Sequence, residues 1–428
     1  MAVGTSNFSV LYQTFYPDTD LPYLVPENLP FWNLLPKEDG LSGQTIDHPW
    51  LYGTKQGFSL SFDAAQAQSG SSPNGIRAVV NASQGYQVLE FFDKDEVLSQ
   101  GEAAYADLFQ KTMTGAFKDF YNRLDLQAHI GNSALAQVTA VVGGVVNGIT
   151  LLANQIAVNT FGAAGVGGFS PETWAEVGMQ LQASTTAPTD GTVPSVTGNI
   201  ATVTAVDPIN RILTLSDASA FTASNYIYQR GNALGFSSAN FNGGMVGLDN
   251  WVPYTAPAAA DNFLGVNRSV YGTRLAGYRY TGTSRSIEDA IKRLGALMSQ
   301  GGAMSASVCL MNPLDFDALD SKMTTFNRYS SFQTATYGFE SIVVSTAAGR
   351  VDVLPDPHMA QGFARILTPD SWLFRHKLQV PHVVDIQGRT AEQALNFDGR
   401  TARMRFYGQL LCLRPHENGI VALPQVAI

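Results

Sequence analysis

A long amphipathic helix is the strongest constraint that this sequence places on its fold. Ser99 and Glu102 have the spacing of a capping box, in which side chains satisfy the first backbone amides of a helix. Apolar residues then recur at three- and four-residue steps, which predicts a helix from about Ser99 to about Ala128. At a rise of about 1.5 Å per residue this helix is about 45 Å long, so a sheet can lie along it. The apolar stripe consists of Tyr105, Leu108, Phe109, Met113, Phe117, Phe120, Tyr121 and Leu124.

The segment before this helix has no regular pattern. Residues 1–57 are rich in proline and aromatic side chains, and the prolines interrupt the hydrogen bonding of both helices and sheets. Aromatic side chains favour burial, so a disordered tail is not expected. This composition predicts an extended arm that becomes ordered by lying on a neighbouring molecule.

Residues 58–93 predict a long hairpin-like loop with little core of its own. Apolar and polar residues alternate on both sides of a polar tip at residues 66–75, which contains Pro73-Asn74-Gly75. The alternating apolar residues are Phe58, Leu60, Phe62, Tyr86, Val88 and Phe92.

The scarcity of charge indicates extensive self-association. Asp, Glu, Lys and Arg make up 14% of the 428 residues, whereas about 25% is typical of soluble domains. A chain of this size has a large surface to hydrate, so we expect much of it to be covered by other protein. The net charge of −9 argues against a dedicated nucleic-acid-binding protein, because such proteins usually carry a basic excess.

The middle of the chain is expected to be rich in strands. Residues 134–158 are apolar enough to suggest a membrane span, but Asn147-Gly148 between β-branched runs is a hairpin signal, so core packing is preferred. Ser170-Pro171 predicts the start of a helix that runs to about Gln182. Residues 185–257 predict an all-β insertion with three short strands.

The C-terminal part of the chain mixes both kinds of element. Ser286 begins a predicted helix that reaches Met298, and Asn312-Pro313 begins another that reaches Leu319. The expected fold class is therefore α+β. Strands are predicted at 305–311, 339–345, 350–354, 363–367 and 401–413.

No catalytic, cofactor-binding or metal-binding constellation is recognised. The six histidines lack the spacing of metal-binding motifs, and the Gly-rich stretch 161–170 lacks that of a phosphate-binding loop. Cys309 and Cys412 each lie in an apolar run, which is typical of buried thiols rather than of a disulfide or a nucleophile. We therefore expect a protein that is not an enzyme and needs no cofactor. The nearest approach to a cluster is His376, His382 and Asp385.

One local excess of positive charge is interleaved with tyrosines. It could contact nucleic acid, but inter-subunit ion pairing with the acidic N-terminal third is preferred because the chain is acidic overall. The cluster consists of Arg268, Arg274, Arg279, Arg285, Lys292 and Arg293, with Tyr271, Tyr278 and Tyr280 between them.

The order of these elements resembles the tailed-phage major capsid protein family, whose subunits have the Johnson fold, also called the Hong Kong 97-type fold. Local matches are the stretch from Asn267 to Gly277, Val308-Cys-Leu-Met-Asn-Pro-Leu314, and Gly349-Arg-Val-Asp-Val353 followed by Pro355-Asp-Pro357. The resemblance covers nearly the whole chain. It implies an N-terminal arm at 1–57, an extended loop (E-loop) at 58–93, a peripheral (P) domain with the spine helix at 94–184, the β-rich insertion domain at 185–257, a return to the P domain at 258–285, an axial (A) domain at 286–369, and C-terminal strands at 370–428.

The resemblance implies hexamers and pentamers of this chain that close an icosahedral shell around double-stranded DNA. The implied partners are other copies of the chain, portal and scaffolding proteins, with or without a decoration protein, and the packaged DNA, with no membrane. The implied location is the virion capsid, assembled in the bacterial cytoplasm. The start of the sequence lacks the basic and apolar regions of a signal peptide, which agrees with this expectation. The alternative within the same fold is an encapsulin-type nanocompartment shell, which encloses protein.

The resemblance also bears on covalent chemistry. Some members of the family join neighbouring subunits through an isopeptide bond from a lysine in the extended loop. No lysine lies between Phe58 and Phe92, and Lys55 and Lys94 lie only at the two ends of that segment. We therefore expect a non-covalent shell.

Overall fold

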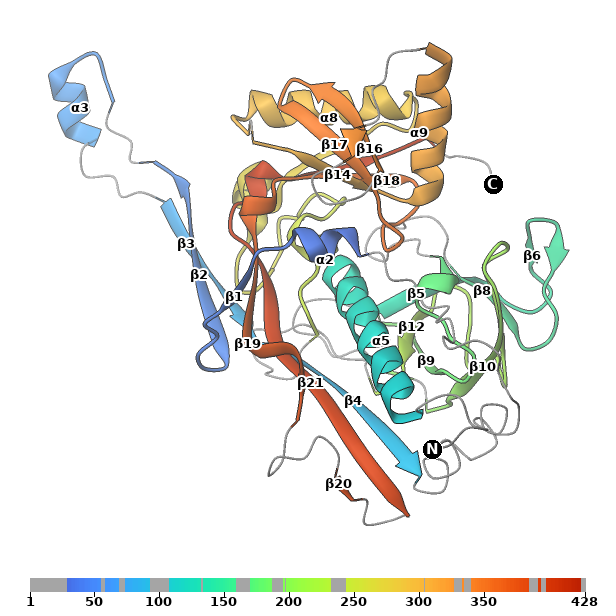
Figure 1. Ribbon diagram of the computed structural model, residues 1–428. Coiled ribbons are helices and arrows are strands. Elements are labelled where there is room, and N and C mark those ends of the chain that lie inside the picture. The colour runs from blue at the N-terminus through green and yellow to red at the C-terminus, as the bar shows by residue number, and fades with distance from the viewer. Residues whose placement is uncertain are drawn as a thin grey trace.

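The structure is a computed structural model, and it combines helices and strands as the sequence predicts (Figure 1). Two sheets and a closed barrel form the body, and a two-stranded ribbon extends from it. The structure describes residues 29–54, 58–68, 74–92, 108–131, 134–158, 170–186, 195–196, 198–231, 244–303, 305–326, 333–334, 340–384, 392–393 and 398–424.

A seven-stranded sheet carries two helices on one of its faces. Helix α8 (Ile287–Gln300) begins at Ser286, whose side chain accepts a hydrogen bond from the amide of Asp289, and α9 (Pro313–Phe326) begins after Asn312, whose side chain caps Leu314. Both predicted starts are confirmed. The strand order is β13 (Tyr278–Thr281), β22 (Gly419–Ala422), β18 (Phe363–Leu367), β14 (Val308–Met311), β17 (Gly349–Pro355), β16 (Glu340–Thr346) and β15 (Gln333–Thr334).

This sheet lies between two hydrophobic cores, and the side chains along its strands point alternately into one core and the other. Along β14, Cys309 and Met311 pack in the cluster that contains α8 and α9, whereas Val308 and Leu310 pack in the larger core of the body. Successive side chains of a strand point to opposite faces, so a strand with both faces covered is buried at every position, as β14 is.

A second sheet lies along the long helix α5 (Leu108–Ile130). Phe120 of the helix packs edge-on against Phe406 of the sheet at a ring distance of 5.9 Å. The helix ends at Gly131, which has a φ of +62°, a conformation that favours glycine. The predicted helix is confirmed over its described part, and residues 99–107 lie outside the described residues. The sheet consists of β1 (Lys37–Asp39), β19 (Trp372–Val383), β21 (Gly399–Cys412), β20 (Glu392–Gln393) and β4 (Ser83–Phe92).

The β-rich module is a closed six-stranded barrel with wider boundaries than the sequence predicts. The three strands expected between 185 and 257 are present, but three more come from residues 134–184. Residues 245–252 form no strand of the barrel. They pack in the large hydrophobic core, where Trp251 is fully buried. Closure pairs strands that are distant in sequence, which local patterns do not reveal. The barrel order is β10 (Ala201–Asp207), β11 (Ile212–Leu215), β8 (Gln155–Val158), β5 (Ala134–Ala140), β12 (Tyr226–Gln229) and β9 (Gln180–Ser184).

Two local expectations in this module have opposite outcomes. The hairpin at Asn147-Gly148 is confirmed, because β6 (Val145–Val146) pairs with β7 (Ile149–Thr150) around it. The helix expected from Ser170 is wrong: a single 3-10 turn, η2 (Pro171–Thr173), is followed by β9. The start signal is real, but Leu181 and Ala183 are needed as inward-facing residues of the barrel, where tertiary packing overrides the local preference.

The remaining short elements connect these units. They are α2 (Pro30–Leu34), β2 (Thr45–Gly53), α3 (Phe62–Gln68), β3 (Asn74–Asn81), α6 (Leu248–Trp251), η3 (Arg268–Tyr271), α7 (Gly272–Ala276), η4 (Pro369–Ser371) and η5 (Pro415–Glu417). Among the described residues, no helix has the length and apolar character needed to cross a membrane.

Candidate functional site

The first candidate site is the ribbon formed by β2 and β3. The two strands pair antiparallel from Thr45 opposite Asn81 to Gly53 opposite Asn74, and α3 lies at the outer end. Figure 1 shows the ribbon and α3 extending away from the sheets of the body. One face of the ribbon packs on the body, where Ile46, Trp50, Ala78 and Val80 are buried, so the projecting part is the segment beyond Gly53 and Asn74.

The outer end of the ribbon exposes large apolar side chains. Phe58 is 90% exposed, Leu60 is 98% exposed and Phe62 is 79% exposed. No residue of α3 is buried. We call Phe58, Leu60 and Phe62 the ribbon tip. Three adjacent exposed apolar side chains at the end of a projection are typical of a surface that another molecule covers.

The ribbon is anchored in the body close to the end from which the chain continues to α3. Trp50 is buried and lies edge-on to Trp251, with 5.7 Å between the ring centroids. Arg274 donates a hydrogen bond of 2.6 Å to the carbonyl oxygen of Tyr52. The ribbon is therefore held where it leaves the body, while its tip has no apolar partner among the described residues.

The sequence identifies this projection but assigns its strands incorrectly. The alternation at residues 58–62 predicts a strand, whereas the strands are β2 and β3, and Phe62 begins a helix rich in alanine and glutamine. β4 is a real strand, but it pairs with β21 in the body. Proline at position 49 is accommodated because β2 is an edge strand of the two-stranded ribbon.

The described part of the expected N-terminal arm packs on its own chain. Phe31 is 2% exposed and Trp32 is 3% exposed; the Trp32 ring lies 4.8 Å from that of Phe374, and β1 pairs in parallel with β19. The expectation that this segment needs a neighbour to become ordered is therefore wrong for residues 29–54. Residues 1–28 and 55–57 lie outside the described residues.

Four side chains of the basic cluster have partners within the chain. Arg268 forms a nearly buried ion pair with Asp261 at 2.9 Å, Arg285 pairs with Asp289, and Lys292 pairs with Glu288. Arg279 donates hydrogen bonds to backbone carbonyls, among them that of Ala276 at 3.0 Å. Each of these four side chains has a partner within its own chain, and ion pairing between subunits stays a prediction. Arg293 is exposed.

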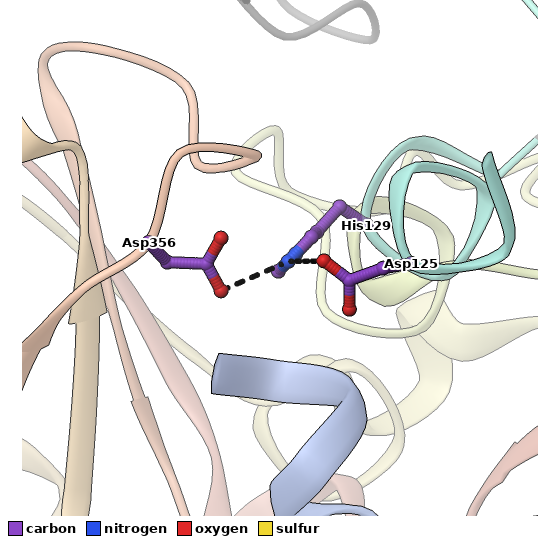
Figure 2. A group of neighbouring side chains, drawn as sticks. All are labelled: Asp125, His129 and Asp356. Atoms are coloured by element: carbon purple, nitrogen blue, oxygen red, sulfur yellow. Dashed lines mark ion pairs between the residues drawn. The ribbon is translucent and has the colours of Figure 1, made fainter. Parts of the chain in front are cut away.

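The second candidate site is a buried cluster that the sequence analysis does not identify. Figure 2 shows the His129 ring between the carboxylates of Asp125 and Asp356. Nε2 of His129 lies 3.1 Å from Oδ2 of Asp356 and 3.7 Å from Oδ2 of Asp125. Nδ1 of His358 lies 2.6 Å from Oδ2 of Asp125. Asp125, Asp356 and His358 are 0% exposed and His129 is 2% exposed.

Burial shifts the pKa values of this cluster. Burial lowers the pKa of His129 to about 3 against the attraction of Asp125, so its imidazole is neutral at pH 7. Burial, aided by repulsion from Asp125, raises the pKa of Asp356 to about 7. Burial also opposes the charged form of His358, but the hydrogen bond and the charge of Asp125 outweigh it and raise its pKa.

The local sequence contains only weak signals for this cluster. Asp125 and His129 are four residues apart on α5 and so share one helix face, and Asp356 and His358 flank Pro357 just after β17. The two pairs are more than 200 residues apart in sequence, and only the fold brings them together.

The other expected features are located as follows. His376 and His382 both lie on β19, and Asp385 lies outside the described residues, as do residues 161–169 of the Gly-rich stretch. Cys309 and Cys412 are free and fully buried, as predicted. Burial raises the pKa of both thiols.

Comparison with known proteins gives structural likenesses only. No family model and no curated protein matches this sequence. The capsid asymmetric unit of cyanophage A-1(L) is similar over 99% of this chain and 99% of that chain, with 10% identity and a TM-score of 0.48. The holo-SrpI encapsulin complex from Synechococcus elongatus is similar over 99% and 95%, with 8% identity and a TM-score of 0.44. The structure titled Mycobacterium phage Adephagia is similar over 100% of both chains, with 7% identity and a TM-score of 0.43.

Proposed function

We propose that this chain is the major capsid protein of a tailed double-stranded DNA phage, a structural rather than a catalytic protein. In this proposal it assembles as hexamers and pentamers into an icosahedral shell, and the ribbon acts as the E-loop that lies on an adjacent subunit. Assembly takes place in the host bacterial cytoplasm and the product is the virion capsid. Portal and scaffolding proteins are the further proposed partners, with or without a decoration protein.

The observation that carries this proposal is the ribbon tip. Its three apolar side chains are between 79% and 98% exposed, at the end of a projection whose inner end is anchored in the core. Transfer of apolar surface from water to a protein contact is favourable by about 25 cal/mol per Å², so covering this tip stabilises an assembly. A repeated contact of this kind between identical subunits builds a closed shell if the rotation between subunits closes.

The low charge content supports the same proposal. Only 14% of residues are charged, whereas about 25% is typical of soluble domains. Few charges therefore remain to keep a separate subunit hydrated, which favours burial of surface between subunits.

The test is assembly of the full-length chain with and without the ribbon tip. The triple variant F58S/L60S/F62S should give capsomers or single subunits but no closed particles by negative-stain microscopy and light scattering. Its thermal unfolding as an unassembled subunit should be close to that of the unassembled wild type, because the substituted side chains contact no core.

A matched control carries V177S/I209S/V270S, which replaces three exposed apolar residues that are scattered singly over the surface. This control should assemble like the wild type. Closed particles formed by F58S/L60S/F62S at wild-type yield would refute the proposed role of the ribbon.

The contents of the particles separate the two shell types. Particles isolated from phage-infected cells should contain nuclease-protected double-stranded DNA under the capsid proposal. Particles that instead enclose a stoichiometric protein cargo would identify the encapsulin-type alternative.

A further inference from the structure

We propose that Asp125, His129 and Asp356 form a buried binding site for a divalent transition-metal ion such as Zn²⁺. His358 acts in this site as the residue that positions the Asp125 carboxylate. The proposal goes beyond the shell function and does not depend on it.

The spacing of the donor atoms matches a metal site. Zinc binds imidazole nitrogen and carboxylate oxygen at about 2.0–2.2 Å, which places tetrahedral ligand atoms about 3.3 Å apart. The distances from Nε2 of His129 to the nearest carboxylate oxygens are 3.1 Å and 3.7 Å. The three donor atoms all lie within 4.8 Å of one another.

Two of these donor atoms lack a hydrogen-bond partner. Nε2 of His129 and Oδ2 of Asp356 are buried and make no hydrogen bond, although they lie only 3.1 Å apart. Their contact satisfies the distance of a hydrogen bond but not its direction. Buried polar atoms nearly always have a hydrogen-bond partner, and a bound ion is one of the explanations for an exception.

The surrounding contacts fix the carboxylates as outer-shell partners of a metal do. The amide of Trp32 donates to Oδ1 of Asp125, and His358 contacts Oδ2 of the same residue at 2.6 Å. The amide of His358 donates to Oδ1 of Asp356 and leaves Oδ2 available. A carboxylate oxygen has two lone pairs, so Oδ2 of Asp125 can bind both His358 and a metal. Such partners orient metal ligands and increase affinity.

The charge of the cluster also favours a cation. Two carboxylates lie in an interior where a lone ionised group is unfavourable, and a divalent ion neutralises both. The imidazole ligand distinguishes this donor set from the all-oxygen sites that Mg²⁺ and Ca²⁺ prefer.

A metal here would join parts of the chain that are distant in sequence. Asp125 and His129 belong to α5, Asp356 follows β17 of the seven-stranded sheet, and Trp32 belongs to α2. The ion would therefore lock the long helix to this sheet, with α2 held against the same carboxylate.

The test is metal binding by the full-length protein after treatment with a chelator and extensive dialysis. Isothermal titration with Zn²⁺ followed by elemental analysis should find about one tightly bound ion per chain. Co²⁺ should give visible absorption bands of tetrahedral intensity, and Mg²⁺ and Ca²⁺ should bind at least about tenfold more weakly. Added Zn²⁺ should raise the temperature of thermal unfolding.

The variant H129Q/D356N should lose at least about tenfold in Zn²⁺ affinity and lose the Co²⁺ bands. The matched control D370N/H416Q, which replaces an exposed carboxylate and a partly exposed imidazole, should behave like the wild type. Unchanged binding in H129Q/D356N would overturn the proposal. If that variant does not fold, the wild-type protein decides alone: the absence of a saturable Zn²⁺ site would also overturn it. Particle assembly is scored separately, so failure here leaves the shell function standing.

Discussion

The seven-stranded sheet with α8 and α9, called the layer below, and the β2–β3 ribbon differ in how far they bury their apolar side chains. In the layer, every residue of β14 is buried, because one face packs on α8 and α9 and the other on the body. In the ribbon, the tip is almost fully exposed. The layer can therefore be stable within one chain, whereas the apolar surface of the ribbon tip is buried only when another molecule covers it. Stability and assembly should respond to different substitutions.

The largest expected loss of stability comes from substitution of Trp32. The sequence analysis assigns this residue to an arm that needs a neighbouring molecule, but in the structure it packs in the body. Trp32→Ala should lower the free energy of unfolding by about 3–5 kcal/mol, because it leaves a cavity beside Phe374. Urea unfolding of unassembled subunits carrying F58S/L60S/F62S measures this effect without interference from shells. Trp32→Phe should lose less, and a loss under about 1 kcal/mol for Trp32→Ala would mean that α2 is not part of the stable body.

A smaller effect concerns Asp315 of α9, which accepts a hydrogen bond from the amide of Gly362 just before β18. Burial raises the pKa of Asp315 from 3.8 to about 6, opposed by that hydrogen bond and by the charge of Arg211. Because the folded pKa is the higher one, the group's contribution to stability is complete below pH 4 and is lost as the pH rises through 6.

Between pH 4 and pH 7 the wild type should therefore lose up to about 3 kcal/mol relative to Asp315→Asn, which does not titrate. The comparison uses urea unfolding of both proteins at each pH. Parallel pH profiles for the two proteins would show that the carboxyl is not shielded from water in the folded state.

The cap of α8 gives a local test within the layer. Ser286→Ala removes the acceptor for the amide of Asp289 and should cost about 1 kcal/mol of unfolding free energy. Ser286→Thr retains a hydroxyl and should restore most of that loss. Assembly of either variant should be unaffected, because the cap is far from the ribbon tip in sequence and takes no part in the proposed contact between subunits.

The smallest expected effect is the absence of covalent linkage through the ribbon. No lysine lies between Phe58 and Phe92, so the ribbon tip itself offers no donor for a bond to a neighbouring subunit; the single lysine between β2 and β3 is Lys55. Mature particles boiled in denaturant should run as one band at the monomer mass. A ladder of covalent oligomers would show that the ribbon is joined to its partner by more than apolar contact.

Local chemistry explains which elements could be predicted. The start of α8 at Ser286, the start of α9 at Asn312-Pro313 and the hairpin at Asn147-Gly148 each depend on a few adjacent residues, and all three are confirmed. The presence of both helices and strands could be predicted from such local signals.

Non-local pairing explains what could not be predicted. The barrel closes through strands from residues 134–184 that local composition assigns elsewhere, and β2 pairs with β3 despite Pro49. The Asp–His cluster joins two pairs of residues more than 200 positions apart, so spacing motifs cannot identify it. For the ribbon, the sequence predicts a projection with little core, but its strands and the helix at its end depend on pairing geometry.

The two buried cysteines can report when the interior of the protein opens. Cys309 lies between the seven-stranded sheet and its helices, Cys412 lies in the core of the body, and burial keeps both thiols protonated and unreactive. A thiol-specific reagent can therefore modify either residue only when the structure around it opens. The rate of labelling at each cysteine, read by mass spectrometry, would time the opening of the two cores separately, in free subunits and in assembled particles alike.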